Sequence, residues 1–167
     1  MGMVHKESFK TWCFRHIMNL FPIYFGTGGK VLYIQNDWKH VTARLKLNIW
    51  TRNYVGTIFG GSQFSAADPF FMLMLFHILG KDFIIWDKSG TIHYKKPGKK
   101  ICKADFVFTD AEIAEIKHQT TLNGKYEFKK QMEWIDADGV VISQIERTLY
   151  VATKEFFKNR KSAVVED

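Results

Sequence analysis

The stretch NYVGTIFGGSQFSAADPFFMLMLFHILG, residues 53–80, decides the fold of this 167-residue chain. Residues 70–79 are almost entirely apolar, so a helix formed there must be covered on all sides. A glycine pair, Gly60 and Gly61, precedes the apolar run, and another glycine ends it. We therefore predict one long helix over residues 62–79, wrapped by a curved sheet, with a second subunit covering what remains.

Segments with the two-residue alternation of β-strands lie on both sides of this helix. We predict strands at residues 31–36, 40–50, 83–87, 91–95, 101–108, 125–135 and 140–153. Thr109 and Glu112 form a capping box for a short helix that ends at Asn123, and the turn at residues 136–139 makes the last two strands antiparallel. One long helix among strands joined mostly by short turns indicates the α+β class.

The composition narrows the class of protein. With 46% hydrophobic residues the chain can build one core but not two, so we expect a single domain over residues 1–167. The 16% of aromatic residues favours an oligomer. Cys13 and Cys102 follow no metal-ligand or redox spacing and no secretory leader opens the chain, so we expect no metal and a cytoplasmic location. The longest apolar run is shorter than the roughly 20 residues that span a bilayer, so we expect no stable membrane insertion.

The net charge of +7 implies attraction to something anionic. Nucleic acid is not the expected partner, because no zinc-ligand set or RNA-binding aromatic pattern accompanies the charge.

Residues 1–30 are predicted to form an amphipathic helix, from Ser8 to Leu20, followed by a glycine-rich connection. We interpret its apolar stripe as packing on the body of the fold, because the stripe is short for a membrane-surface helix. The stripe consists of Phe9, Trp12, Cys13, His16, Ile17 and Leu20.

Asn53, Gly56, Gly60, Gly61 and Asp68 stand at a recognisable spacing. The pattern resembles the hotdog-fold acyl-CoA thioesterases of the phenylacetate-degradation type, which read Asn, Gly, His-Gly-Gly and then an acidic residue seven positions after the second glycine. The resemblance extends weakly to about residue 152 and leaves out the first 30 residues. The Asp-Pro pair and the earlier Gly-Gly opening look more like an uncharacterised branch, known only as a domain of unknown function.

The resemblance implies a hotdog fold, a homodimer or dimer of dimers, and an acyl-CoA or related acyl thioester as substrate. Without side chains, Gly60 and Gly61 let a carbonyl approach the N–H groups at a helix N-terminus, where one donor is worth about 3 kcal/mol to a transition state. Asp68, about two turns further on, fits a general base or a nucleophile, and Asn53 fits a group that holds water or the carbonyl. By resemblance, Asp68 of one subunit faces Asn53 and Gly60 of the other.

Each of these residues also has a structural interpretation. Asp68 before Pro69 is a common helix start, with the aspartate as N-cap. Asn53 also fits the end of a strand, and the glycines also fit a simple turn. Phe59 stands where the family has histidine, and a phenyl ring cannot donate a hydrogen bond. We therefore expect a thioester hydrolase, with a non-catalytic acyl or acyl-CoA binding module as the alternative.

A lysine cluster and Phe59 complete the predicted substrate site. The lysines flank a turn at residues 97 and 98 and fit either the phosphates of coenzyme A or a solvated hairpin tip. Coenzyme A enters only as part of the substrate, so no separate cofactor is expected. The cluster consists of Lys95, Lys96, Lys99 and Lys100.

Overall fold

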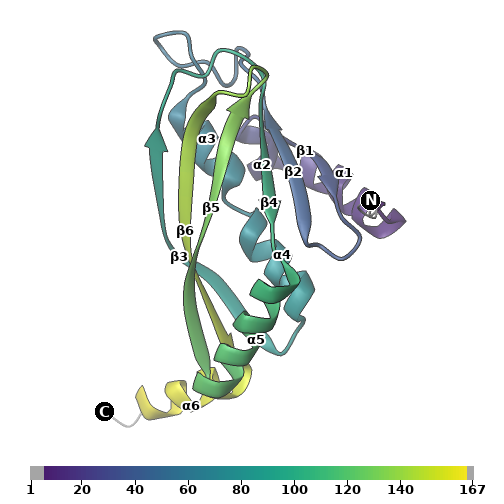
Figure 1. The fold of residues 1–167 in the computed structure, drawn as a ribbon, viewed down its shortest axis with the longest axis vertical. Coiled ribbons are helices and arrows are strands. Elements are labelled where there is room, and N and C mark those ends of the chain that lie inside the picture. Colours follow the sequence, from purple (N-terminus) through teal and green to yellow (C-terminus); the bar gives the residue numbers. More distant parts are fainter. Residues whose placement is uncertain (1–5, 165–167) are drawn as a thin grey trace.

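The computed structural model describes residues 6–164, with side chains described to residue 159, and contains one six-stranded antiparallel sheet (Figure 1). The strands lie in the order β1-β2-β4-β5-β6-β3. Their bounds are β1 Gly29–Ile34, β2 His40–Leu45, β3 Phe83–Tyr94, β4 Cys102–Val107, β5 Lys125–Asp136 and β6 Val141–Thr153. The predicted α+β class is confirmed, and the arrangement is consistent with a hotdog fold. The ends of the expected 1–167 domain lie outside the described residues.

Within the described residues, six helices accompany the sheet: α1 Phe9–Leu20, α2 Pro22–Gly26, α3 Gly60–Ala67, α4 Phe70–Leu79, α5 Asp110–Asn123 and α6 Lys154–Val164. Helices α3 and α4 follow one another along one face of the sheet (Figure 1). The capping box of Thr109 and Glu112 is present at the start of α5, and Gly124 ends that helix in the left-handed conformation. Helices α2 and α6 were not expected from the sequence.

The long helix of the sequence prediction is divided at Asp68 and Pro69. Helix α3 begins at Gly60, two residues earlier than predicted. Asp68 and Pro69 both keep right-handed helical dihedrals, and the Asp68 N–H still donates to the Ser65 carbonyl at 3.3 Å. Pro69 has no N–H to continue the ladder, which explains the break. No side chain caps α4, so the interpretation of Asp68 as its N-cap is wrong.

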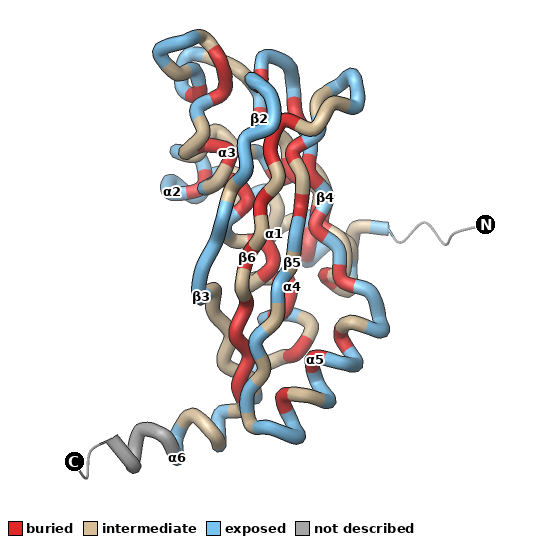
Figure 2. The backbone as a smooth tube through the Cα atoms, turned by 60° about the vertical axis from the view of Figure 1, so that its left-hand side comes forward, coloured by how far each residue is buried: buried red, intermediate tan, exposed pale blue. Residues whose placement is uncertain are grey.

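The core lies between α4 and the middle of the sheet. Phe70 and Phe71 of α4 pack on Phe106 of β4, with ring centroids 4.7 and 5.2 Å apart. Strand β6 is buried along most of its length (Figure 2). Burying one such side chain stabilises the fold by about 2 kcal/mol, so this aromatic layer fixes α4 on the sheet.

Most strand boundaries lie within two residues of the prediction, and two parts of the prediction differ by more. The strand expected over residues 40–50 ends at Leu45 because the next residues form a turn. There the Asn48 side chain accepts hydrogen bonds from the N–H groups of Trp50 and Thr51 at 2.8 and 3.1 Å. Such local bonds compete with a sheet ladder. The two strands expected over residues 83–95 are one strand, β3, with a bulge after Asp87.

Helix α1 turns the predicted apolar stripe to solvent. Thr11 is buried and Phe14 packs on Trp38 with ring centroids 4.8 Å apart, whereas Phe9 and Leu20 are 79% and 78% exposed. The stripe therefore does not pack on the body of the fold, and that interpretation was wrong. The helix is held instead by Asn19, whose side chain accepts a hydrogen bond from the Val31 N–H and donates one to the Val31 carbonyl on β1.

No helix of the described residues is long and apolar enough to cross a bilayer.

Candidate active site

A cleft of about 710 Å³ opens beside the N-terminus of α3. It brings together six of the residues singled out in the sequence: Asn53, Phe59, Gly60, Gly61, Lys95 and Lys96. The loop before α3 forms one wall, and the end of β3 with the turn after it forms the other. Asp68, Lys99 and Lys100 do not line this cleft.

The N-terminus of α3 faces the cleft without a side-chain cap. The Gln63 N–H makes the first helical bond, to the Phe59 carbonyl at 3.2 Å, so the amides before it belong to the uncapped first turn. Both positions need glycine, because neighbouring aromatic side chains come too close to the backbone to leave room for a Cβ atom. A methyl group at Gly60 would clash with the Tyr94 hydroxyl, and one at Gly61 would clash with the Phe59 ring. The turn is therefore closely covered by two aromatic side chains.

Gln63 fixes this turn to the sheet. Its buried side chain donates to the Ile58 carbonyl at 3.2 Å and accepts from the Ser143 hydroxyl at 2.7 Å. Its backbone carbonyl accepts from the Trp134 indole N–H at 2.8 Å. Buried polar groups that are fully paired hold one geometry, so α3 begins at a defined position against β5 and β6.

Asn53 is engaged in its own loop. Its side-chain amide donates to the Thr57 hydroxyl and its side-chain oxygen accepts from the Thr57 N–H, both at 2.9 Å. Asn53 therefore shapes the loop that precedes Phe59.

Asp68 lies at the opposite end of α3. It stands eight positions after Gly60, which corresponds to about 12 Å along a helix axis at 1.5 Å per residue. Its side chain is 59% exposed, and one carboxylate oxygen accepts a hydrogen bond from Arg147 Nη2. Within one chain, the carboxylate and the glycine turn cannot touch the same carbonyl.

Arg147 of β6, which the sequence analysis missed, joins Asp68 to the sheet. Its side chain is 6% exposed and also donates to one Asp87 oxygen from Nε at 2.8 Å and from Nη2 at 2.6 Å. The guanidinium lies 4.9 Å from the centre of the Phe64 ring. Burial raises the pKa of the Asp87 carboxyl, and the Arg147 charge opposes that rise.

A signal for Arg147 was present in the sequence. In β6 the inward positions alternate, and Ser143, Ile145, Arg147 and Leu149 are all buried. A charge at an inward strand position needs a partner. The partners themselves, on β3 and at the end of α3, follow only from the fold.

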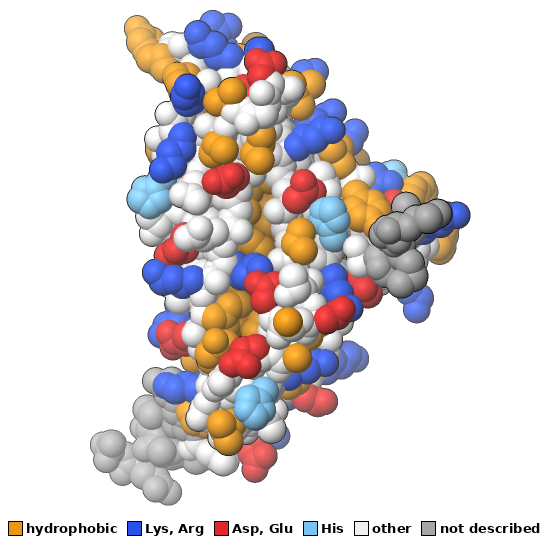
Figure 3. All heavy atoms as spheres, in the orientation of Figure 1, with side chains coloured by type: hydrophobic (Ala, Val, Ile, Leu, Met, Phe, Trp, Pro, Cys, Tyr) orange, Lys and Arg blue, Asp and Glu red, His pale blue; other side chains and the backbone are white. Residues whose placement is uncertain are grey.

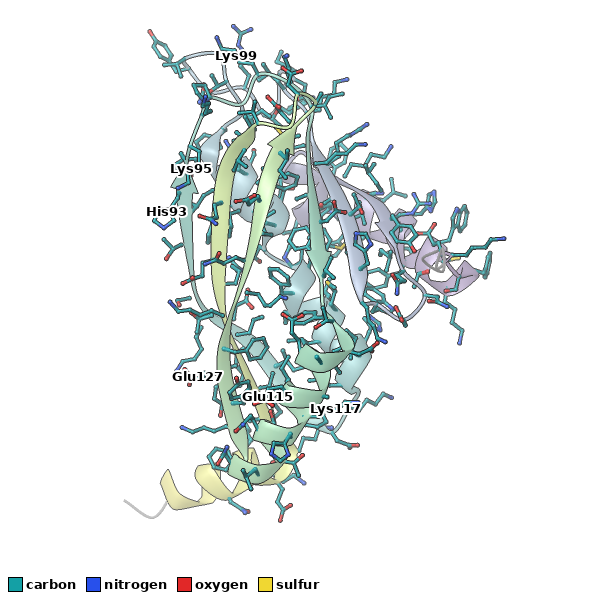
Figure 4. All side chains as sticks on the ribbon, in the orientation of Figure 1. His93, Lys95, Lys99, Glu115, Lys117 and Glu127 are labelled. Carbon is teal, nitrogen blue, oxygen red and sulfur yellow. The ribbon has the colours of Figure 1, made fainter. Side chains whose placement is uncertain are left out.

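The lysine cluster is divided. Lys95 and Lys96 line the cleft, and the backbone N–H groups of both donate to the Ile142 carbonyl. Lys99 lies in the loop beyond β3 (Figure 4). Lys100 pairs with Asp138. His93 of β3 and Lys95, directly after the strand, lie along the outer edge of the sheet (Figure 4). Among the described residues, no three His, Cys, Asp or Glu side chains gather as metal ligands would.

The model of the family described as Domain of unknown function (DUF4442) matches residues 10–151. The chain belongs to this family. The predicted branch is thereby confirmed as a domain of unknown function, and the phenylacetate-type signature stays a prediction. No curated protein sequence matches the chain.

Solved structures share the fold of this DUF4442 protein at low sequence identity. Protein PA5026 of Pseudomonas aeruginosa, described as a protein of unknown function and probable thioesterase, has a TM-score of 0.74 and 18% identity over 89% of this chain and 99% of its own. Thioesterase HI1161 of Haemophilus influenzae has a TM-score of 0.63 and 12% identity over 90% and 96%. Protein OLEI01261 of Chlorobaculum tepidum, of unknown function, has a TM-score of 0.66 and 13% identity over 83% and 91%.

Replacing Arg147 should destabilise the fold through the carboxylate that it leaves behind. We expect Arg147→Met to lower the free energy of unfolding by about 3 kcal/mol, the lower end of the loss for a buried pair, because the partly buried Asp87 is left without its cation. Adding Asp87→Asn should restore part of this loss. Urea unfolding at neutral pH measures both changes, with Lys129→Met, which breaks the exposed pair with Glu146, as the control. Equal effects of Arg147→Met and Lys129→Met would contradict the proposed anchor.

Proposed function

We propose that this protein hydrolyses an acyl thioester, such as an acyl-CoA, at a site shared by two subunits. The observation that carries the proposal is the layout of α3. An uncapped glycine turn faces a cleft at one end, and an exposed carboxylate lies at the other end. Two antiparallel copies of such a helix would set the turn of one chain beside the carboxylate of the other. The shared fold with thioesterase HI1161 supports the reaction class.

The edges of the sheet favour β3 as the subunit contact. Along β1, the other edge, Asn19 occupies the N–H and carbonyl of Val31, and Glu7 accepts from the Ile34 N–H. Such bonds block the pairing of an edge strand with another chain. Strand β3 has 12 residues and pairs only with β6 among the described strands. Pairing of two β3 strands would extend the sheet across a dimer and would cover Phe76 of α4, which is 51% exposed.

The proposed reaction begins with the thioester carbonyl at the glycine turn. Amides of Gly60 and Gly61 stabilise the negative oxygen that forms when water attacks the carbonyl carbon. Asp68 of the partner chain removes the proton from that water, the C–S bond breaks, and the proton passes to the leaving thiolate. The products are a carboxylic acid and a thiol. Alternatively, Asp68 attacks the carbonyl directly, and water then opens the resulting anhydride.

Tyr94 replaces the hydrogen-bond donor that Phe59 cannot supply. The Tyr94 side chain is 57% exposed, and its hydroxyl lies against Gly60 at the mouth of the cleft. A phenol hydroxyl donates one hydrogen bond and fits a carbonyl held at this turn. Lys95 and Lys96 follow it in the sequence and line the same cleft, where they would meet the phosphates of coenzyme A. Lys99 and Lys100 then belong to a solvated turn.

The second candidate function is a non-catalytic acyl or acyl-CoA binding module. It is favoured by one observation, the apolar ring of Phe59 in the cleft, at the position where the phenylacetate-type pattern has histidine. This function keeps the cleft and its lysines but gives Asp68 no chemical role.

Asp68→Asn should abolish turnover and leave the dimer intact, because the amide keeps the shape but cannot accept the proton. The assay is a hydrolysis screen over an acyl-CoA panel, with oligomeric state measured by light scattering. Asp110→Asn, at another exposed aspartate, is the matched control. Unchanged turnover in Asp68→Asn would reject the role of Asp68. Binding without hydrolysis by the unaltered protein would support the binding module.

Tyr94→Phe should lower kcat roughly a hundredfold with little change in KM, the loss typical of one oxyanion donor. Steady-state kinetics on the best substrate of the panel measure both parameters. Tyr54→Phe, at an exposed tyrosine that lines the same cleft, should leave them unchanged. An equal response of the two variants would remove Tyr94 from the mechanism.

A further inference from the structure

The helix pair α1 and α2 presents an apolar face that the body of the protein does not cover. Its large side chains, together with one from the turn after β2, are 45% to 87% exposed. We name this surface the N-terminal face. Its apolar members are Phe9, Trp12, Leu20, Phe25 and Trp50. Figure 3 shows hydrophobic and basic side chains next to one another where α1 projects from the molecule.

The side chains of the N-terminal face form one continuous surface. Phe9 stacks on Trp12 and Trp12 packs on His16, with ring centroids 6.0 and 4.1 Å apart. His16 borders a hollow of about 520 Å³ between α1, α2 and the first two strands. Leu20, Phe25 and Trp50 line the same hollow. The aromatic row on α1 therefore leads directly into a cavity with an apolar rim.

The charge of this region is strongly positive. Residues 8–67 contain seven Lys and Arg and a single acidic residue, Asp37, so this segment holds most of the net charge of +7. Four basic side chains line the hollow, and no acidic one does: Arg15, His16, Lys30 and Arg44. Arg15 pairs with Glu7, whereas Lys30 and Arg44 have no ion pair among the described residues. The Arg44 Nε is buried and has no hydrogen-bond partner there.

We infer that the N-terminal face docks the protein on a lipid bilayer that contains anionic phospholipids. Aromatic and aliphatic side chains beside Lys and Arg are the composition of surfaces that lie at the headgroup level. A lipid phosphate in the hollow would give the Arg44 guanidinium the acceptor that it lacks. Each basic side chain near an anionic bilayer adds to the attraction, and the apolar side chains would enter the boundary between headgroups and acyl chains.

A second copy of the chain is a poorer occupant of this face. Two such faces would bring like charges together, and repulsion between them opposes contact. The face also lies at the β1 edge of the sheet, whereas the proposed dimer pairs at β3, the opposite edge. Membrane docking and the proposed dimer are therefore compatible, and docking does not depend on the proposed reaction.

Vesicle sedimentation tests this inference on the full chain. We expect the protein to bind vesicles of phosphatidylcholine mixed with phosphatidylglycerol, and to bind pure phosphatidylcholine far less. Trp50→Ser and Lys30→Glu should each reduce binding at least roughly tenfold, through lost insertion and lost attraction respectively. Leu122→Ser and Lys117→Glu make the same changes at exposed positions of α5, outside the face, and should leave binding unchanged.

A second measurement locates the contact. Brominated lipids should quench tryptophan fluorescence of the unaltered protein, and Trp50→Phe should lose part of that quenching while circular dichroism stays unchanged. Absence of binding to the anionic vesicles would overturn the inference. Equal losses of vesicle binding in the two α5 control variants would also overturn it. So would self-association of the protein that Trp50→Ser abolishes, because the N-terminal face would then bind a second copy of the chain.

Discussion

Helix α3 is a rigid spacer between the glycine turn and Asp68, and its length constrains how the proposed site can be assembled. The amides of the glycine turn and the Asp68 carboxylate are fixed about 12 Å apart along the same helix axis. A nucleophile and an oxyanion donor must lie about 3 Å from one carbonyl group, so a single chain cannot supply both. The two parts of the site therefore have to come from two chains, or Asp68 has no role in the chemistry.

Polar contacts hold both ends of the spacer to the same strand, a buried one at its start and a partly exposed one at its end. Near its start, the Gln63 side chain bonds Ser143 of β6. At its end, Asp68 pairs with Arg147, which lies four residues further along β6 on the same face of the strand. Pro69 interrupts the backbone ladder directly after Asp68, so the helix ends there while the chain continues into α4. Because α4 follows directly and packs its buried face on the sheet, the C-terminal end of α3 cannot shift without disturbing the core. This rigidity is what a preorganised site requires.

The sequence predicted the parts of the fold that depend on local chemistry. The glycine turn before α3 and the capping box of α5 each depend on residues within a few positions of one another. Arg147, Asp87 and Tyr94 were missed because their roles arise from contacts between β6, β3 and α3, which are distant in sequence. The stripe of α1 was assigned to the wrong side because periodicity identifies an apolar face but not what covers it. Thr11 lies on the packed side because its hydroxyl is satisfied locally by Ser8, so burial costs little.

The most direct test of the shared site is complementation between two defective chains. Differently tagged Asp68→Asn and Gly60→Val chains are coexpressed, and the heterodimer is purified through both tags. Each parent homodimer should be inactive, whereas the heterodimer should recover about half of the activity of the unaltered dimer, since one of its two sites is intact. A heterodimer as inactive as its parents, with the dimer shown to be assembled, would contradict a site built from two subunits.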